Sequence, residues 1–438
     1  MDQVLVAGFL IAALFVLFAA GLWIGLGLLA CGWIAMALFT SRPVGDAMVT
    51  TIWGSSSSWT LTALPMFIWM GEILFRTRLS EDMFRGLAPW MTRIPGRLLH
   101  TNVIGCTIFA AVSGSSAATC ATIGKMSIPE LRARKYPEDM VIGTLAGAGT
   151  LGLLIPPSLI MIVYGVATDV SISKLFIGGV IPGILLGTLF SGYIVVWSLL
   201  NPGKIPEPTE RYTFMEKVYA SRHLLPTVGL IVAVLGSIYV GIATATEAAG
   251  LGVVGALLVA KLQGSLTWQT FKESLLGATR LSCMIALILA GAAFLTLAMG
   301  FTGLPRHLAD WIGQMGLSAG ALIVVLTVFY IILGCFLDGI SMIVLTMAIV
   351  LPMIEKLGID LVWFGIFLVL VVEMAQITPP VGFNLFVLQG MTGHQITYIA
   401  RTAFPLFLLM CVAVALIYFF PGLVTWLPNQ MIGNAAGG

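Results

Sequence analysis

The amino-acid sequence predicts an all-α integral membrane protein made of two inverted copies of one helical unit. Of its 438 residues, 59% are hydrophobic and only 9% are charged, whereas a typical soluble domain carries about 25% charged residues. The mean hydropathy is +1.05, and the 49 glycines and 20 prolines are tolerated in membrane helices whose neighbours satisfy the freed backbone groups. A net charge of +2 without a polybasic tract excludes nucleic acid as a partner.

Cysteine and histidine spacing argues against a disulfide scaffold or a zinc site. All six cysteines lie in apolar stretches without CxxC spacing, and the four histidines are far apart in the sequence, so neither framework is expected. The first residues, MDQVLVAGFL, lack the basic region and the cleavage site of a signal peptide. We therefore expect the first apolar segment to remain as a membrane helix.

Uncharged stretches separated by short charged loops set the predicted order of helices. No charged residue lies between Asp2 and Arg42, which leaves room for two helices of about 20 residues each, with a break near Gly21 to Gly27. Most of the later uncharged stretches are also long enough to span a bilayer. One polar linker, Asn201 to His223, separates two halves. The predicted organisation is scaffold (frame) and interfacial arm helices in 1–97, a hairpin and broken helix in 98–200, the linker in 201–222, a second set of frame and arm helices in 223–316, and a second hairpin and broken helix in 317–438.

The two halves align with each other at an offset of 223 residues. Four prolines coincide at this offset, which pairs Pro129 with Pro352, Pro156-Pro157 with Pro379-Pro380, and Pro182 with Pro405. Four matches at one offset, spread over more than fifty residues, indicate two copies of one structural unit.

Basic residues at both ends of the stretch 98–124 indicate a re-entrant hairpin. Arg93 and Arg97 precede the stretch, and Lys125 and Arg132 follow it, so both flanks are expected in the cytoplasm. A single crossing cannot have both ends on one side, and limbs of about 12 residues would reach about 18 Å into the membrane. The matching stretch 317–353 predicts a hairpin entering from the opposite side. Five full crossings and one hairpin per half place both termini outside and the linker in the cytoplasm.

The first hairpin tip and the segment after it predict a cation site. The tip reads AAVSGSSAAT, and the next helix, GTLAGAGTLGLLIPPS, is interrupted by two prolines. Unwound backbone at membrane depth is tolerated beside protein or a water-filled cavity, and its carbonyl oxygens suit a hard cation such as sodium. The predicted sodium-binding residues in this half are Ser113, Ser115, Ser116, Gly149 and Pro156, and the predicted substrate-binding residues are Ser116 and Ser158.

The second half repeats the arrangement with LGCFLDGISM and QITPPVGFN. The offset places Asp338 over Ser115, and an isolated carboxylate deep in the bilayer is costly unless a cation compensates it. The alternative for Asp338 is a structural hydrogen bond that holds the tip. The predicted cation ligand in this half is Asp338. Thr378 and Asn384 flank the second proline break and could supply oxygens to a cation or donors to a substrate, and the predicted substrate-binding residues are Ser341 and Asn384.

Three further acidic residues lie in apolar segments. Glu72, Glu247 and Glu373 each lie in a stretch where a helix end could hold them, and a structural or interfacial role is favoured for all three. The segments 76–97 and 261–280 mix basic and apolar residues and fit helices lying flat in the interface. An ordinary charged loop explains the same pattern.

With these motifs in view, the chain resembles the large membrane subunit of tripartite ATP-independent periplasmic (TRAP) transporters over nearly its whole length. The resemblance rests on AVSGSSAAT with IPEL, GTLGLLIPPS, FLDGISM and ITPPVGFN. It implies an elevator-type transporter in the bacterial inner membrane, driven by sodium, with two hairpins and two broken helices. The resemblance also implies a second sodium-binding region that contains Asp338, Gly339, Thr378 and Val381. It also implies a separate small four-helix membrane subunit (Q), because no such extension precedes Met1, and a periplasmic binding protein that delivers an organic anion.

Other functions remain open at this stage. A stand-alone sodium- or proton-coupled carrier of divalent anions has similar hairpins but needs no binding protein. An intramembrane hydrolase would need a base beside the tip serines, and His100 lies at the far end of a limb, so no enzyme is expected. Duplicated hairpins favour alternating access over a continuous channel. The sequence alone does not identify the substrate or the number of coupling ions.

Overall fold

The computed structural model describes residues 3–207, 212–303, 307, 318–334, 337–380 and 382–431, and within these residues every regular element is a helix. Six of the described helices are long and apolar enough to cross a membrane, and two bent helix pairs raise that number to eight. Four shorter apolar helices accompany them. The predicted all-α membrane fold is thus confirmed, and the chain is a multi-pass membrane protein.

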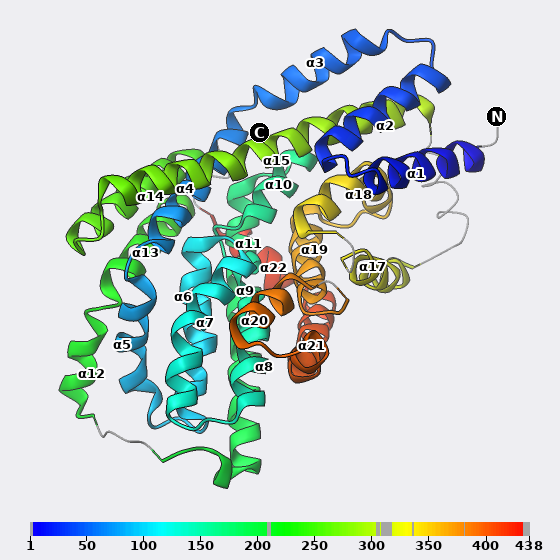
Figure 1. Cartoon of the computed structure of the whole chain (residues 1–438). Coiled ribbons are helices and arrows are strands. Elements are labelled where there is room, and N and C mark those ends of the chain that lie inside the picture. The colour runs from blue at the N-terminus through cyan, green and yellow to red at the C-terminus, as the bar shows by residue number, and fades with distance from the viewer. Residues whose placement is uncertain are drawn as a thin grey trace.

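The frame consists of long helices from the start of each half. In Figure 1, α2, α3, α4, α14 and α15 lie along one side of the molecule, and α15 runs across most of its width. Its 35 residues correspond to roughly 50 Å of helix, well beyond the thickness of a bilayer core. The frame and arm elements are α1 (Gln3–Ala19), α2 (Ile24–Phe39), α3 (Val44–Ser56), η1 (Trp59–Thr62), α4 (Ala63–Phe75), α5 (Leu79–Met91), η2 (Arg97–Leu99), α12 (Phe214–Ser221), α13 (Leu225–Tyr239), α14 (Ala245–Leu262) and α15 (Trp268–Thr302).

Two helical hairpins and two broken helices form the rest of the described chain. The first hairpin is α6 and α7, and the second is α17 and α18. The first broken helix is α8, α9 and α10, and the second is α19 and α20. Their bounds, with those of the remaining elements, are α6 (His100–Ser113), α7 (Ser116–Ala133), α8 (Glu138–Gly149), α9 (Leu151–Leu154), α10 (Leu159–Thr168), α11 (Ile172–Leu200), η3 (Pro202–Lys204), α17 (Ala319–Leu333), α18 (Gly339–Lys356), α19 (Leu361–Gln376), α20 (Phe383–Thr392), α21 (Ile396–Phe419) and α22 (Gly422–Asn429).

Element boundaries reproduce the sequence offset of 223 residues. Helix α7 starts at Ser116 and α18 at Gly339, while α8 starts at Glu138 and α19 at Leu361. The proline pairs occupy the break between α9 and α10 and the break between α19 and α20, and both contain a cis peptide bond. Each half therefore follows the same helix order, in which a hairpin is followed by a broken helix and a long helix.

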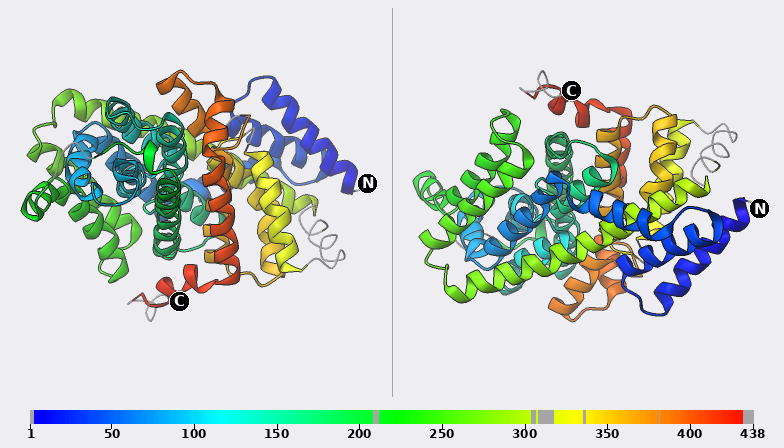
Figure 2. Two further views of the ribbon diagram at one scale, coloured as in Figure 1. Left: turned by 90° about the horizontal axis from the view of Figure 1, so that it is seen from below. Right: turned by 90° about the horizontal axis from the view of Figure 1, so that it is seen from above.

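Contacts between the halves are reciprocal. Helix α10 packs against α18, and their repeat equivalents α20 and α7 also pack against each other. In the frame, α15 contacts α2 while α4 contacts α14. In each case a helix of the first half contacts a helix of the second half, and their repeat equivalents make the same contact in reverse. This reciprocity is typical of two copies related by a two-fold axis. The views in Figure 2 show the result, with helices of the two halves interleaved and α1 and α22 well apart.

The described frames of the two halves differ where α3 meets α4. In the first half a bend of 57° separates α3 from the helical segment Trp59–Phe75, whereas the equivalent residues of the second half form the single helix α15. The first half has a run of four serines, Ser55 to Ser58, where the second half has Ala-Thr-Arg-Leu. Serine side chains compete for backbone hydrogen bonds and weaken helices. The segment 261–280, one predicted interfacial helix, is divided between the end of α14 and the start of α15.

Candidate functional site

The tip of the first hairpin is a one-residue left-handed turn followed by a capped helix. Helix α6 ends at Ser113, and Gly114 follows with φ of 58°, a conformation that residues with a side chain rarely adopt. The hydroxyl of Ser115 then accepts a hydrogen bond from the Ala118 N–H at 3.4 Å and caps α7. The predicted tip SGSS is therefore a helix break that places several oxygen atoms within two turns.

The serines of this tip bond to one another and to the next turn. The hydroxyl of Ser113 lies 2.6 Å from that of Thr119 and donates to the Ser115 carbonyl at 3.3 Å. Ser116 is 2% exposed, whereas Ser113 and Ser115 are half-buried. In the described part of the chain, no three His, Cys, Asp or Glu side chains gather as a metal site.

The first broken helix packs directly on this tip. The N–H of Leu159, the first residue of α10, donates to the Gly114 carbonyl at 3.4 Å. A Cβ on Gly152 would lie 2.6 Å from the Ser115 carbonyl oxygen and 2.6 Å from the Ser116 Cα, so only glycine fits. Ser158 is fully buried and accepts from the Met161 N–H at 3.4 Å, which caps α10. Hairpin and break are thus one packed unit.

The buried carboxylate of Glu373 connects this unit to the second half. Glu373 lies near the end of α19 and is 0% exposed. Its Oε1 accepts hydrogen bonds from the Ser116 hydroxyl and from the Leu153 N–H, the latter at 2.9 Å. Its Oε2 has no partner within the described residues. Glu373 thus lies at the interior junction of α7, α9 and α19 and not at a membrane interface, and its two hydrogen bonds fit the structural alternative favoured from the sequence.

At the second hairpin, Asp338 is the cap of α18. Its Oδ2 accepts from the Ile340 N–H at 3.1 Å and the Ser341 N–H at 3.3 Å, and the Ser341 hydroxyl donates to Oδ1. These hydrogen bonds are the ones expected if Asp338 holds the hairpin tip structurally. Ser115 caps α7 of the first half in the same way. A carboxylate has about four lone-pair sites, so these bonds leave acceptor capacity for a cation.

Gly339 and the second break complete the set of predicted residues. A Cβ on Gly339 would lie 2.6 Å from side-chain atoms of both Ile160 and Val372, which places this tip between the first broken helix and α19. The Thr378 hydroxyl donates to the Met374 carbonyl at 2.7 Å. Val381 lies outside the described residues.

Asn384, one residue into α20, is fully buried, and neither its Oδ1 nor its Nδ2 has a hydrogen-bond partner among the described residues. A Cβ on Gly149 would approach Asn384 Nδ2 to 3.2 Å, so the side chain faces the first broken helix. An unpartnered buried amide is costly. It is therefore a strong indication of a ligand site.

Four helices begin at the hairpin tips and breaks, namely α7, α10, α18 and α20. Helix α7 packs against α20, and α10 packs against α18. The N-terminus of a helix carries a partial positive charge and free N–H groups. This arrangement favours a bound anion, and neighbouring oxygens of the tips suit a cation.

The other predicted acids lie away from this junction. Glu72 bonds Arg76 at 3.1 Å, and Arg76 also bonds Glu273 at 3.0 Å, so these residues join α4 to α15. Glu247 closes a capping box with Thr244 at the start of α14. Both roles are structural, as favoured from the sequence.

A charged cluster ties the base of the first hairpin to both broken helices. Arg132 Nε donates to the two carboxylate oxygens of Glu138 at 2.9 and 3.0 Å, and His394 Nε2 lies 3.1 Å from Glu138 Oε1. The hydrogen bond to Glu138 raises the pKa of the Arg132 guanidinium. Since His394 follows α20, this cluster joins the two halves at the opposite end from the tips.

Duplicated hairpins packed on broken helices define a class of protein, the membrane permeases built from internal repeats whose sites lie at helix breaks. The chain has a TM-score of 0.64 to the crystal structure of the Alcanivorax borkumensis YdaH transporter, covering 94% of this chain and 100% of that one, at 12% sequence identity. That likeness concerns the fold.

Residues 11–423 match the sequence profile described as the tripartite ATP-independent periplasmic transporter, DctM component. The chain belongs to this family and is a large permease subunit of the TRAP type. It is 32% identical over 401 residues to the C4-dicarboxylate TRAP transporter large permease protein DctM of Pseudomonas aeruginosa, covering 91% of this chain and 93% of the relative. It is 27% identical over 424 residues to the sialic acid TRAP transporter large permease protein SiaM of Vibrio cholerae, covering 92% and 98%.

Proposed function

We propose that this subunit carries an organic anion into the cell together with sodium, by elevator-type movement of the hairpins and broken helices against the frame. Its partners in this proposal are a small four-helix membrane subunit and a periplasmic binding protein, in the bacterial inner membrane with both termini periplasmic. The sialic acid and C4-dicarboxylate named for the relatives support an organic acid as the substrate. No reaction chemistry is assigned to the chain.

The observation that carries the proposal is the buried, unpartnered amide of Asn384, which faces the first broken helix from the start of α20. An anionic group placed beside Asn384 would receive its amide N–H groups and would face the positive ends of helices. The caps Ser115, Ser158 and Asp338 already hold some of the first backbone N–H groups of three of these helices. Ser116, Ser158, Ser341 and Asn384 are all buried beside these ends and form our substrate-binding set. An organic anion fits this polarity better than a cation or a neutral sugar.

Sodium is proposed to bind at the two tips as cotransported cargo. The oxygens of Ser113, Ser115, Ser116, Gly149 and Pro156 would form the first site. Asp338, Gly339, Thr378 and Val381 would form the second. Each net positive charge that enters down the membrane potential contributes about 2.3 kcal/mol per 100 mV, so two or more sodium ions would drive the accumulation of an anion.

The decisive experiment distinguishes two roles of Asp338, as the cap of α18 and as a ligand of a cation. The melting temperature of the purified chain is measured in NaCl and in matched choline chloride and KCl for the wild type, Asp338→Ser and Asp338→Ala. Serine can still cap α18, as Ser115 caps α7, but lacks the charge. We expect Asp338→Ser to melt like the wild type in choline and to lose most of the sodium-dependent increase. Asp338→Ala should lose about 0.5–2 kcal/mol of stability in every salt.

A full sodium-dependent increase in Asp338→Ser would show that the residue is only a cap. No difference between the salts in the wild type would contradict sodium binding by this subunit. Uptake of a radiolabelled organic acid into proteoliposomes, with and without the small subunit and the binding protein, then tests the partners. Uptake that needs neither partner would favour a stand-alone carrier.

A further inference from the structure

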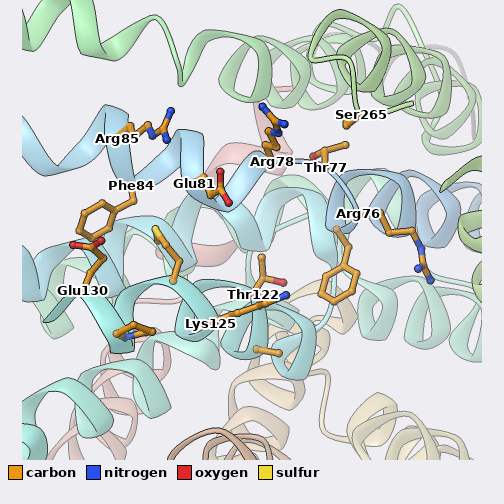
Figure 3. Close-up of a pocket in the computed structure, with 14 residues that line it drawn as sticks. Arg76, Thr77, Arg78, Glu81, Phe84, Arg85, Thr122, Lys125, Glu130 and Ser265 are labelled. Atoms are coloured by element: carbon orange, nitrogen blue, oxygen red, sulfur yellow. The ribbon is translucent and has the colours of Figure 1, made fainter. Parts of the chain in front are cut away.

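A cleft with a volume of about 890 Å³ lies between the arm helix α5 and the second limb of the first hairpin, away from the tips. Figure 3 shows residues of α5 on one side of it, residues of α7 on the other, and Ser265 from the α14–α15 loop at one end. The residues of α7 that line it, such as Thr122, Lys125 and Pro129, recur every three to four positions. This spacing means that one face of α7 is turned toward the cleft.

The cleft has an excess of unpaired positive charge. Arg78 and Arg85 beside or on α5, and Lys125 on α7, are exposed and form no ion pair among the described residues. Of the two lining acids, Glu130 is paired with Arg134 at 3.4 Å and Glu81 is exposed. In Figure 3, Arg78 and Arg85 extend away from α7, on the side of their segment opposite Thr122 and Lys125, so both guanidinium groups would have to turn to reach a ligand between the two elements.

Two buried donors along the cleft lack acceptors. Thr122 is 8% exposed, and its hydroxyl has no hydrogen-bond partner in the described part of the chain. Arg76 is held by Glu72 and Glu273, yet its Nε–H has no acceptor there. Unsatisfied buried donors are rare in proteins. Their position in a cationic cleft indicates a ligand that supplies acceptor oxygens.

Apolar and aromatic residues place the cleft at the level of a membrane interface. Phe75, Phe84 and Met126 are part of its lining. Trp268, three residues beyond Ser265, is 78% exposed, and Trp90 at the far end of α5 is 36% exposed. Exposed tryptophans mark the headgroup region of a bilayer. A lipid could therefore place its phosphate among the cations while its acyl chains remain in the membrane.

We propose that this cleft binds the phosphate group of an anionic phospholipid, with Arg78, Arg85 and Lys125 as charged partners and Thr122 as a donor. Phosphate oxygens accept strong hydrogen bonds from guanidinium groups, and Lys125 adds a point charge. The lipid would join an arm helix of the frame region to a hairpin limb. The inference does not rest on sodium coupling or on elevator movement.

The test is a lipid titration of the full-length chain in detergent. Binding is followed by native mass spectrometry and melting temperature with phosphatidylglycerol and, at the same mole fraction, phosphatidylcholine. The variant is Arg78→Gln/Arg85→Gln/Lys125→Gln. The control Arg93→Gln/Lys261→Gln/Arg280→Gln removes the same charge from exposed positions that do not line the cleft. We expect phosphatidylglycerol to bind the cleft variant at least about tenfold more weakly and to bind the control like the wild type.

Thr122→Val provides a conservative second variant. It removes a buried hydroxyl without a partner, so the lipid-free protein should melt at the same or a higher temperature, while affinity for phosphatidylglycerol falls by about fivefold. Equal loss of affinity in both charge variants, or equal binding of phosphatidylcholine, would overturn the proposed site. A further titration with inorganic phosphate distinguishes a lipid headgroup from a soluble phosphate as the ligand. If inorganic phosphate stabilises the wild type and not the cleft variant, and does so as well as the lipid, a soluble phosphate replaces the lipid as ligand.

Discussion

Glu373 shows why single residues of the site were hard to rank from the sequence. In the motif VVEMAQITPP, Glu373 is an isolated acid in an apolar segment. An isolated acid within a membrane segment indicates a functional position. The partner of Glu373, Ser116 on α7, is 257 positions away, and the two meet because α9 packs against both α7 and α19. Ser115 and Asp338 were easier, because the repeat offset paired them before their capping roles were seen.

The first prediction concerns the stability that Glu373 provides. In Glu373→Ala the Ser116 hydroxyl and the Leu153 N–H lose their acceptor, and each unsatisfied buried group costs about 1–3 kcal/mol. In Glu373→Gln a carbonyl oxygen can still accept both bonds. We expect the alanine variant to melt well below the wild type and the glutamine variant to recover most of the difference. Thermal unfolding in detergent measures both.

Glu81→Ala is the control for this comparison, since Glu81 is an exposed acid. Its melting temperature should match the wild type, because exposed acids contribute little to stability. If Glu373→Ala also melted like the wild type, the two hydrogen bonds would not hold hairpin and break together.

Among the elements, the hairpins and broken helices were predictable and the continuity of the frame helices was not. Paired prolines remove backbone donors wherever they occur, so the breaks at 155–158 and 377–382 follow from local chemistry. In contrast, α15 continues through a region whose counterpart in the first half is bent. The serine run from Ser55 to Ser58 was visible in the sequence, but propensity alone does not decide whether a helix continues.

The second prediction concerns the contact between α9 and the first hairpin tip. Gly152→Ala places a Cβ within 2.6 Å of the tip backbone, and overpacking of this kind typically costs about 1–3 kcal/mol. The tip must move, so we expect a lower melting temperature and a weaker sodium-dependent increase. Measuring melting curves in NaCl and choline chloride distinguishes the two effects.

Gly192→Ala on α11 is the matched substitution, because nothing lies within 4 Å of its added Cβ. Alanine favours a helix over glycine by up to about 1 kcal/mol, so this variant should melt at the same or a higher temperature and respond normally to sodium. A normal sodium response in Gly152→Ala would argue against a cation site formed by the first tip.

At the scale of the whole molecule, a glycine of the frame lies directly against the tip of the first hairpin. Gly71 on α4 lies against the tip, and an added Cβ would stand 3.1 Å from the Val112 carbonyl oxygen and 3.2 Å from that of Ser113. Helix α4 also packs against α6 and α10. If the hairpins move against the frame as proposed, this close contact exists in only one of the two positions of the hairpin relative to the frame.

The last prediction uses this contact to test that movement. Gly71→Leu overpacks the present arrangement by about 1–3 kcal/mol, which changes the population of two states roughly 5- to 150-fold. We expect transport in proteoliposomes to fall by about tenfold or more. Because the added side chain meets the Ser113 carbonyl, the sodium-dependent rise in melting temperature should weaken as well. Gly71→Ala should have a smaller effect. Gly250→Leu on α14, where an added Cβ meets nothing within 4 Å, should transport normally. Unchanged transport by Gly71→Leu would mean that the frame and the first hairpin need not return to this contact during the cycle, and would count against the proposed elevator movement.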